Sequence, residues 1–318
     1  MMISDETPLT HDASMSDGTA STAEPTDATP KPTAQPWVTR LAVVACIGIF
    51  LGITAQNDFE SWESLAKFGY LPADSIWDGG YWALVTSAFV HLALWHVAFN
   101  VYWLRVLGSR LEEKIGSLKF LAFFVVAAMV SSSVQLAFSG DTGIGASGVV
   151  YAIFGFMWPT RYRYPRFNEV LDERTIQIFV VWLGFCVVAT HLKIWNVGNA
   201  AHISGLLFGG AVAGAFVLPY KPRLMLAGLV TLVGLSIVPL FWCPWNVTWL
   251  SHQAYSAHAA EQYDAALERY NQIIRLDPEN AWAHLNRSYV YEALGKLDEA
   301  QADLERAREI DPSIEKAE

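Results

Sequence analysis

From Thr175 to Ala260 the chain contains neither aspartate nor glutamate, and most of this stretch is apolar. Charged residues make up only 16% of the 318 residues, whereas a soluble globular protein usually carries about 25%. Apolar runs of spanning length lie near 38–55, 92–111, 118–138, 176–192, 200–219 and 224–242, with a shorter run at 147–160. The sequence therefore predicts an all-α, polytopic membrane bundle of seven helices with soluble ends.

Composition divides the chain into four parts. Residues 1–36 are rich in Ser, Thr, Ala, Asp and Pro, so we expect a disordered tail there. Six apolar runs fall in 37–219, a seventh, additional span falls in 220–246, and residues 247–318 are polar again. The first run starts too late, after too acidic a segment, for a cleaved signal peptide, so we expect it to remain in the membrane. The net charge of −10 comes mainly from the two ends and does not indicate a nucleic-acid partner.

Basic residues between the runs predict the orientation. The connections after the second, fourth and sixth runs hold ten of them: Arg105, Arg110, Lys114, Lys119, Arg161, Arg163, Arg166, Arg174, Lys221 and Arg223. The opposite connections hold only Lys67 and Lys193. Because basic loops stay in the cytoplasm, we expect a cytoplasmic N-terminus and Ser147 toward the outside. The C-terminal part also lies outside if 224–242 crosses the membrane rather than lying at the interface. A bacterial inner membrane is the expected location, since no organelle-targeting segment is visible.

The C-terminal part contains an internal repeat. "YDAALERYNQIIRLDP" (263–278) matches "LDEAQADLERAREIDP" (297–312) at a shift of 34 residues, which resembles the tetratricopeptide repeat. Glu261 occupies the place of the usual turn glycine, which Gly295 keeps. Two repeats are fewer than a free-standing stack needs, so we expect the membrane domain or a partner to complete them. Stacked helices present a groove, which favours a protein or peptide partner over a passive soluble cap.

Polar side chains inside apolar runs are costly and tend to mark function. His96 and Asn100 are four residues apart on one helix face, Ser147 begins the short run, and His202 lies near the start of the sixth. In the expected orientation all of them lie at the outer ends of their helices and can converge. Each has a simpler explanation alone: Ser147 as a small packing residue, His202 as a core histidine, and His96 bonded to Asn100 across one turn.

The joint occurrence of these residues at one depth indicates a serine nucleophile. A serine hydroxyl needs a neighbouring base, usually histidine, so Ser147 and His202 form the expected pair. Apolar runs four to seven contain no carboxylate, so we expect a dyad rather than a triad. The Ser147 amide at a helix start, with the side chains of His96 and Asn100, would stabilise an oxyanion. Tyr151, one turn below Ser147, could hold the imidazole.

Small residues around these positions predict close helix packing. Gly145 and Gly148 flank Ser147 and allow a sharp turn into the helix. Two stripes of small residues, on the fourth and sixth runs, let the helices approach closely: Gly148, Ala152 and Gly155, and Gly205, Gly209 and Ala213.

Taken in order, these motifs resemble those of the rhomboid family of intramembrane serine proteases over residues 40–219. The matching motifs are HxxxN (His96, Asn100), GxSG (Gly145, Ser147, Gly148), AHxxG (Ala201, His202, Gly205) and the helix end "LEEKIGS" with Glu112 and Gly116. The resemblance implies a six-helix core, transmembrane protein substrates cleaved near the surface of the lipid bilayer, and no metal or cofactor.

The resemblance also implies roles for individual residues. Ser147 is implied as nucleophile, His202 as general base and then general acid, and His96 and Asn100 as oxyanion donors. Tyr151 is implied as the ring beneath His202. In addition, Phe99 and Trp182 resemble residues of a lateral substrate gate between the second and fifth helices.

Two departures and several alternatives remain at this stage. Trp82 is followed by Ala83 where the family often has a Trp-Arg pair, and the seventh span is seen in one branch of the family only. The main alternative is a catalytically inactive rhomboid-like protein that binds membrane clients, which usually lacks the serine or the histidine. A zinc protease would need an HExxH motif, and an aspartyl intramembrane protease would need paired aspartates within the spans. A transporter would need more charged residues at mid-bilayer.

Overall fold

The structure is a computed structural model that describes residues 35–58, 60–218 and 221–314. These residues form α-helices and short 3-10 and π-helical turns, without a strand. The tail expected at 1–36 lies outside the described residues except for Gln35 and Pro36. The all-α fold expected from the sequence is therefore confirmed for the part of the chain that the structure describes.

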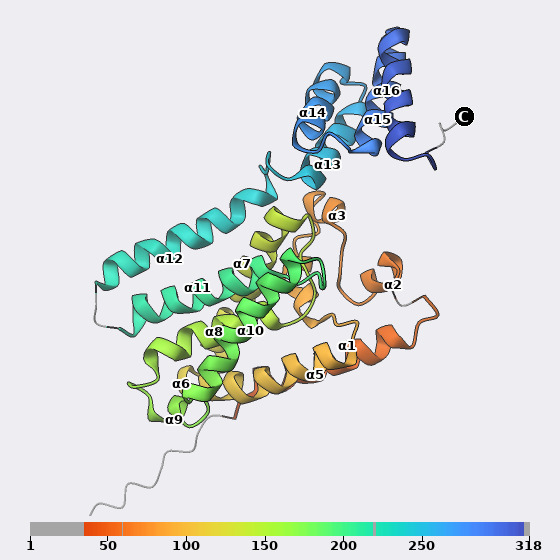
Figure 1. The fold of residues 1–318 in the computed structure, drawn as a ribbon. Helices are drawn as coiled ribbons and strands as arrows, with labels where there is room; N and C mark the ends of the chain where they lie inside the picture. The colour runs from red at the N-terminus through yellow and green to blue at the C-terminus, as the bar shows by residue number, and fades with distance from the viewer. Residues whose placement is uncertain (1–34, 59, 219–220, 315–318) are drawn as a thin grey trace, which may run out of the picture. The chain divides into compact units, whose positions relative to one another are not determined.

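Seven long helical segments form the bundle (Figure 1). They are α1 (Trp37–Thr54), α5 (Leu94–Trp103) continued through a π-helical turn (Leu104–Gly108) into α6 (Ser109–Ile115), α7 (Ser117–Ser139), α8 (Ser147–Thr160), α10 (Glu173–His191), α11 (Asn199–Phe216) and α12 (Pro222–Ile237). Among the described residues, five helices can cross a membrane by length and composition, or six if 83–89 and 94–115, bent by 102°, form one span. The second helix runs to Ile115 rather than to 111 and ends at Gly116, whose φ of +84° favours glycine and stops the helix.

Helix α8 lies at the centre of the bundle although it is only 14 residues long. Ten consecutive residues, 148–157, are buried, so the helix is apolar on all sides. A helix of that kind belongs in a core rather than against lipid or water. Its first residue, Ser147, is thereby placed inside the protein at one end of this core.

Helices α8 and α11 pack against each other more extensively than any other pair. A Cβ atom added at Gly205 would overlap the carbonyl oxygen of Gly148, and one at Gly209 would overlap that of Ala152. At Gly155 it would overlap the carbonyl of Leu206. The close approach predicted from the two small-residue stripes is confirmed, and it requires glycine at these positions.

Glu112 joins the end of α6 to the start of α1. Its fully buried carboxylate accepts hydrogen bonds from the amides of Val38 and Thr39 at 2.9 and 2.8 Å, and from the hydroxyls of Thr39 and Ser117 at 2.7 and 2.6 Å. The first amides of a helix have no acceptor within the helix, so a carboxylate there caps it and offsets the helix dipole. This contact gives a physical reason for the glutamate in "LEEKIGS".

Short helices build the long connection between α1 and α5. They are α2 (Trp62–Ala66), α3 (Ala73–Trp77), α4 (Ala83–Thr86) and a 3-10 turn (Ser87–Phe89). A further short helix, α9 (Pro165–Asn168), lies between α8 and α10. The connection 55–93 meets the bundle at the same end as Ser147, because its Ser87 carbonyl accepts from the Gly145 amide, two residues before Ser147.

The C-terminal part consists of two helical hairpins, α13 (Val247–Ala259) with α14 (Tyr263–Leu276) and α15 (Ala281–Ala293) with α16 (Leu297–Ile310). Gly295, in the turn of the second hairpin, has φ +73°, and Glu261, at the equivalent turn of the first, has φ +57°. The left-handed region disfavours residues that have a Cβ, so the first repeat keeps the turn geometry without its usual glycine.

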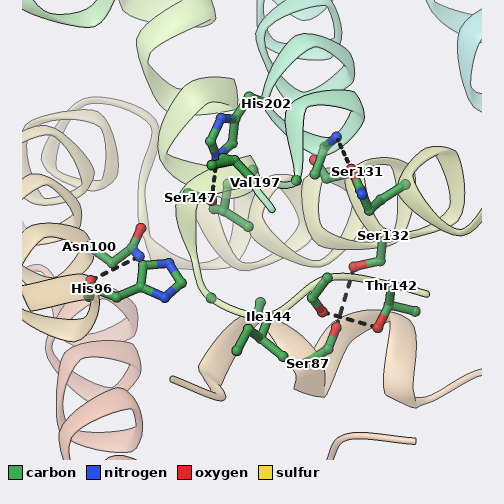
Figure 2. Close-up of a pocket in the computed structure, with 18 of the residues that line it drawn as sticks. Ser87, His96, Asn100, Ser131, Ser132, Thr142, Ile144, Ser147, Val197 and His202 are labelled. Atoms are coloured by element: carbon green, nitrogen blue, oxygen red, sulfur yellow. Dashed lines mark hydrogen bonds between the residues drawn. The ribbon is translucent and has the colours of Figure 1, made fainter. Parts of the chain in front are cut away.

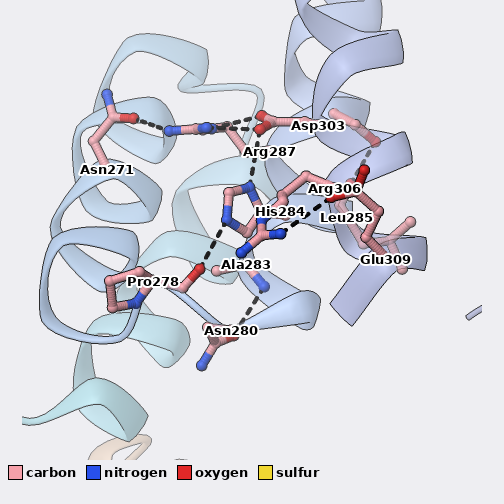
Figure 3. A network of polar contacts seen from close by, with 11 residues as sticks. Asn271, Pro278, Asn280, Ala283, His284, Leu285, Arg287, Asp303, Arg306 and Glu309 are labelled. Carbon is pink, nitrogen blue, oxygen red and sulfur yellow. Dashed lines mark hydrogen bonds and ion pairs between the residues drawn. The ribbon is translucent and has the colours of Figure 1, made fainter. Parts of the chain in front are cut away.

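A buried polar network joins three helices of the repeats (Figure 3). The Arg287 guanidinium on α15 donates to both carboxylate oxygens of Asp303 on α16 and to Asn271 on α14. His284 lies 3.0 Å from Asp303 through Nδ1 and 3.4 Å from the Pro278 carbonyl through Nε2. Because the buried carboxylate has two nitrogen-bearing partners, it fixes the relative register of the repeat helices.

The first repeat is joined to the bundle at the end of α7. The backbone carbonyl of Ala137 accepts from the side chains of Trp245 at 3.1 Å and Asn246 at 3.2 Å, and Asn246 also donates to the Leu136 carbonyl at 3.3 Å. The Leu136 carbonyl also accepts from the Gly140 amide at 3.0 Å, so the side chains of Trp245 and Asn246 add to the backbone cap at the end of α7. The membrane domain therefore supports the first repeat, one of the two possibilities expected from the sequence.

A second contact joins the repeats to the connection between α1 and α5. His252 on α13 lies between two carboxylates, 3.6 Å from Asp74 and 3.4 Å from Asp78. Its ring also packs on Trp77 with centroids 5.7 Å apart. Helix α13 thus rests on α3 as well as on α7.

Candidate active site

Ser147 and His202 meet at one end of the bundle (Figure 2). The Ser147 hydroxyl oxygen lies 2.8 Å from Nε2 of His202, although the two residues are 55 positions apart. Ser147 is the first residue of α8, and His202 lies in the first turn of α11. The close packing of these two helices sets the distance between the two side chains.

The loop before α8 determines how Ser147 is presented. Gly143 and Gly145 have φ +66° and +97°, a region that side chains with a Cβ avoid. A Cβ at Gly145 would also lie 2.7 Å from the imidazole of His96. The Gly145 amide donates to the Ser87 carbonyl at 3.0 Å, which ties the loop to the segment before α5. Glycine is therefore required at 145 both for its backbone angle and for the close approach of a histidine.

His202 is oriented by its surroundings rather than by a carboxylate. The residue is 4% exposed, and its ring lies over that of Tyr151, with centroids 4.8 Å apart. The Tyr151 hydroxyl donates to the Phe179 carbonyl at 3.1 Å, which holds the phenol ring in place. Nδ1 of His202 is buried and has no hydrogen-bond partner among the described residues. The arrangement is that of a serine–histidine pair without a third member.

The oxyanion donors expected from the sequence lie in the same cavity but are not all directed at Ser147. The Asn100 amide nitrogen donates to the backbone carbonyl of His96 at 3.1 Å, one turn back in α5. The Asn100 side-chain oxygen is buried and has no partner within the described part of the chain. The His96 ring packs edge-on against that of His91, with centroids 4.9 Å apart. In this structure the Asn100 amide therefore bonds across one turn of its own helix, the simpler of the two roles considered for it, rather than pointing at Ser147 as an oxyanion donor.

A cavity of about 540 Å³ contains the Ser147–His202 pair. Its inner wall includes His96, Asn100 and Tyr151. One side is aromatic: Phe99 on α5 contacts Trp182 on α10 with ring centroids 5.4 Å apart. The two residues expected to form a gate therefore do lie between α5 and α10.

A second aromatic pair closes the same side and was not anticipated from the sequence. Trp95, in the first turn of α5, stacks on Trp195 in the connection between α10 and α11, with centroids 5.4 Å apart and planes 15° from parallel. Trp195 belongs to a short loop, whose conformation hydrophobic periodicity does not predict.

The polar wall opposite the aromatic side was also missed. Ser131, Ser132 and Gln135 of α7 line the cavity, and Gln135 accepts a hydrogen bond from the Ala201 amide at 3.1 Å. Ala201 directly precedes His202, so this contact fixes the start of α11. The signal was present in the sequence: "SSSVQ" is a polar run inside an otherwise apolar span, which tends to mark a functional wall.

Comparison with protein-family models gives two matches. A rhomboid domain matches residues 78–220, and a tetratricopeptide repeat matches residues 257–315. The first includes the serine–histidine pair, the cavity wall formed by α7 and the aromatic side between α5 and α10. Both resemblances noted from the sequence motifs are confirmed, and the chain is an integral membrane protein with a helical-repeat region at its C-terminal side.

Proposed function

We propose that this membrane protein, which contains a rhomboid domain followed by tetratricopeptide repeats, is an active serine endopeptidase that cleaves transmembrane segments of other proteins. Proteins with this domain are usually intramembrane serine proteases, but the family also has inactive members. The observation that carries the proposal is the 2.8 Å contact between Ser147 Oγ and His202 Nε2. An inactive client-binding homologue would not need a nucleophile and a base in contact.

The reaction follows from this contact. Nε2 of His202 takes the hydroxyl proton while Oγ of Ser147 attacks the peptide carbonyl carbon, which forms a tetrahedral oxyanion. Collapse of that intermediate breaks the C–N bond, and His202 returns the proton to the leaving amine. Water, deprotonated by the same imidazole, then releases the acyl group from Ser147. The phenol ring of Tyr151 keeps the imidazole in line during both steps.

Donors around Ser147 would hold the oxyanion. The amides of the first turn of α8 have no acceptor within the helix and point toward its start. The His96 imidazole and the Asn100 amide lie on the same cavity. Asn100 takes part after its amide turns from the His96 carbonyl toward the substrate, a rotation about side-chain bonds alone. Aligned donors of this kind contribute about 3 kcal/mol each to the stability of the transition state.

Substrate would reach Ser147 from the lipid, between α5 and α10. On this side of the cavity the contact between Phe99 and Trp182 is one between aromatic side chains. Such a contact separates by rotation of side chains, without breaking backbone hydrogen bonds. The repeats are of a kind that binds proteins, and we assign to them a protein or peptide partner.

Orientation follows from the charges. The basic residues around the junction of α6 and α7, and those of the connections after α8 and α11, would face the cytoplasm of a bacterial inner membrane. Ser147 and the repeats would face the outside. Protease added to intact spheroplasts is then expected to cut within the repeats, and to cut the connection 161–174 only after the membrane is permeabilised. Protection of the repeats in intact spheroplasts would reverse the proposed orientation of α12 or of the whole bundle.

A fluorophosphonate probe tests the proposed nucleophile directly. The serine oxygen displaces fluoride from phosphorus, which leaves a stable covalent label. We expect one labelled peptide that maps to Ser147, and at least a roughly tenfold slower reaction in His202→Ala because the base is missing. A label on another serine, or unchanged labelling of His202→Ala, would contradict the serine–histidine assignment.

A further inference from the structure

Only two formally charged side chains line the cavity among the residues that the structure describes, its histidines aside: Glu60 and Asp141. Both are carboxylates. Neither forms an ion pair with a described lysine or arginine. Two carboxylates without an ion-pair partner among the described residues therefore lie on the wall of a cavity that holds a nucleophile.

The two carboxylates lie at one end of the cavity. Glu60 belongs to the connection between α1 and α5, and Asp141 to the loop between α7 and α8. Both segments meet the bundle where α8 begins, which is the outer end in the proposed orientation. A polypeptide that enters between α5 and α10 and crosses Ser147 would continue outward past these two residues.

Local contacts hold Asp141 in this position. Its side-chain oxygen accepts from the Gly143 amide at 2.7 Å, in the loop that presents Ser147. Burial, and then the charge of Asp141, raise the pKa of Tyr70, another residue of the cavity wall. Asp141 and Tyr70 thus lie on the same cavity wall.

The cavity is built to receive a peptide rather than being a chance acidic surface. Asn100 and Ser131 both line it, are 1% and 3% exposed, and carry buried oxygens without hydrogen-bond partners among the described residues. Buried polar atoms of this kind are ordinarily satisfied, so they call for donors or acceptors from a bound molecule. A peptide backbone supplies both.

We propose that Glu60 and Asp141 make the protease selective for substrates whose segment just outside the membrane carries lysine or arginine, and that they disfavour acidic segments. This inference rests on the proposed proteolytic function and specifies its substrate class. The surroundings reinforce the charge: the basic residues of the outer connections of the bundle are only Lys67 and Lys193, and acidic side chains outnumber basic ones by twelve to six over 247–314.

The expected effect is moderate and depends on salt. An exposed charge pair changes an equilibrium by about fivefold at most, and like charges oppose association by a similar factor. At low ionic strength we expect kcat/KM to differ by about tenfold between a substrate flanked by three lysines and one flanked by three glutamates. At about 0.5 M salt the Debye length falls to roughly 4 Å, and the difference should largely disappear.

The test uses the full chain in detergent and three single-span substrates that are identical except for the outer flank, which is Lys-Lys-Lys, Gln-Gln-Gln or Glu-Glu-Glu. Wild type should cleave them in that order. In the double variant Glu60→Gln, Asp141→Asn, the lysine-to-glutamate ratio should fall markedly toward one, and only the weaker effect of the surrounding acidic surface should remain. The loop keeps its shape in this variant, because the side-chain oxygen of the introduced asparagine still accepts from the Gly143 amide.

Glu63→Gln is the matched control for the double variant. Glu63 is an exposed carboxylate of the same connection, outside the cavity. Its loss removes one negative charge from the outer surface and none from the cavity wall, so the variant should keep the wild-type order of the three substrates.

The outcomes separate this inference from the function on which it rests. Equal cleavage of the three substrates by wild type, or an unchanged ratio in the double variant, overturns the selectivity and leaves the protease intact. A lost ratio in Glu63→Gln would assign the selectivity to the outer surface in general and overturn the role of the cavity carboxylates. Cleavage of none of the substrates would overturn the proposed function and the selectivity together.

Discussion

Ser147→Ala is expected to abolish cleavage of a single-span substrate, with kcat at least about 10⁴-fold lower, while the protein still inserts and folds. The substitution removes the hydroxyl oxygen that lies 2.8 Å from His202 Nε2 and leaves the packing of α8 unchanged, because alanine is smaller and favours a helix. Cleavage of a fluorescent single-span substrate in detergent measures the loss, and thermal unfolding of the purified variant reports the fold.

The matched control for this substitution is Ser204→Ala. Ser204 is buried and lies two residues from His202, but its hydroxyl donates to its own helix, to the Ala200 carbonyl at 2.6 Å. We expect its activity to stay within a few-fold of wild type. His202→Ala should match Ser147→Ala, and combining the two should add little, since residues that act as a unit are not additive. Residual cleavage by Ser147→Ala at the wild-type rate would refute the mechanism.

Gly205→Ala is expected to impair both the site and the fold. The added Cβ would overlap the carbonyl oxygen of Gly148 and lie 3.1 Å from the Ser131 hydroxyl, so α11 has to move away from α8. Overpacking of this kind costs about 1–3 kcal/mol of stability. A displacement of about 1 Å between nucleophile and base lowers the rate by about 10²-fold. Thermal unfolding and cleavage of the same substrate measure the two effects.

Gly210→Ala separates this steric effect from a general intolerance of alanine in α11. A Cβ at Gly210 would lie 3.8 Å from the Gly155 carbonyl, an ordinary contact, so activity and melting temperature should stay close to wild type. Equal damage from both substitutions, or none from Gly205→Ala, would show that the Ser147–His202 distance does not depend on the glycine contact.

The meeting of Ser147 with His202 could be predicted because it depends on regular structure. Polar residues at the same depth of straight apolar helices must lie in one plane, and the stripes of small residues specify which helices touch. The same reasoning located Tyr151 one turn below Ser147. It also predicted the bundle and the repeats, since both follow from periodic patterns that tertiary contacts reinforce.

The remaining features depend on choices that periodicity does not encode. Asn100 can bond either its own helix or a ligand, and asparagine readily bonds the carbonyl four residues back. Trp195 lies in a loop, and the hydrogen bond between Gln135 on α7 and Ala201 on α11 joins two helices that are far apart in the sequence. The contact between Glu112 and the start of α1 could not be predicted either, because it joins residues more than 70 positions apart and involves backbone amides.

The caps at the end of α7 affect how the repeats can be removed in practice. Trp245 and Asn246 precede α13, yet they satisfy the carbonyls of Leu136 and Ala137, on the helix that forms the polar wall of the cavity. A chain cut before residue 245 would remove these side-chain donors. The Leu136 carbonyl would keep the Gly140 amide at 3.0 Å, but the Ala137 carbonyl would keep only the Cys243 thiol at 3.6 Å, a loss of about 1–3 kcal/mol if that carbonyl stays buried. A truncation that ends after Asn246 keeps this joint. Only with that truncation can a change in cleavage be attributed to the loss of a partner that binds the repeats, rather than to damage to the membrane domain.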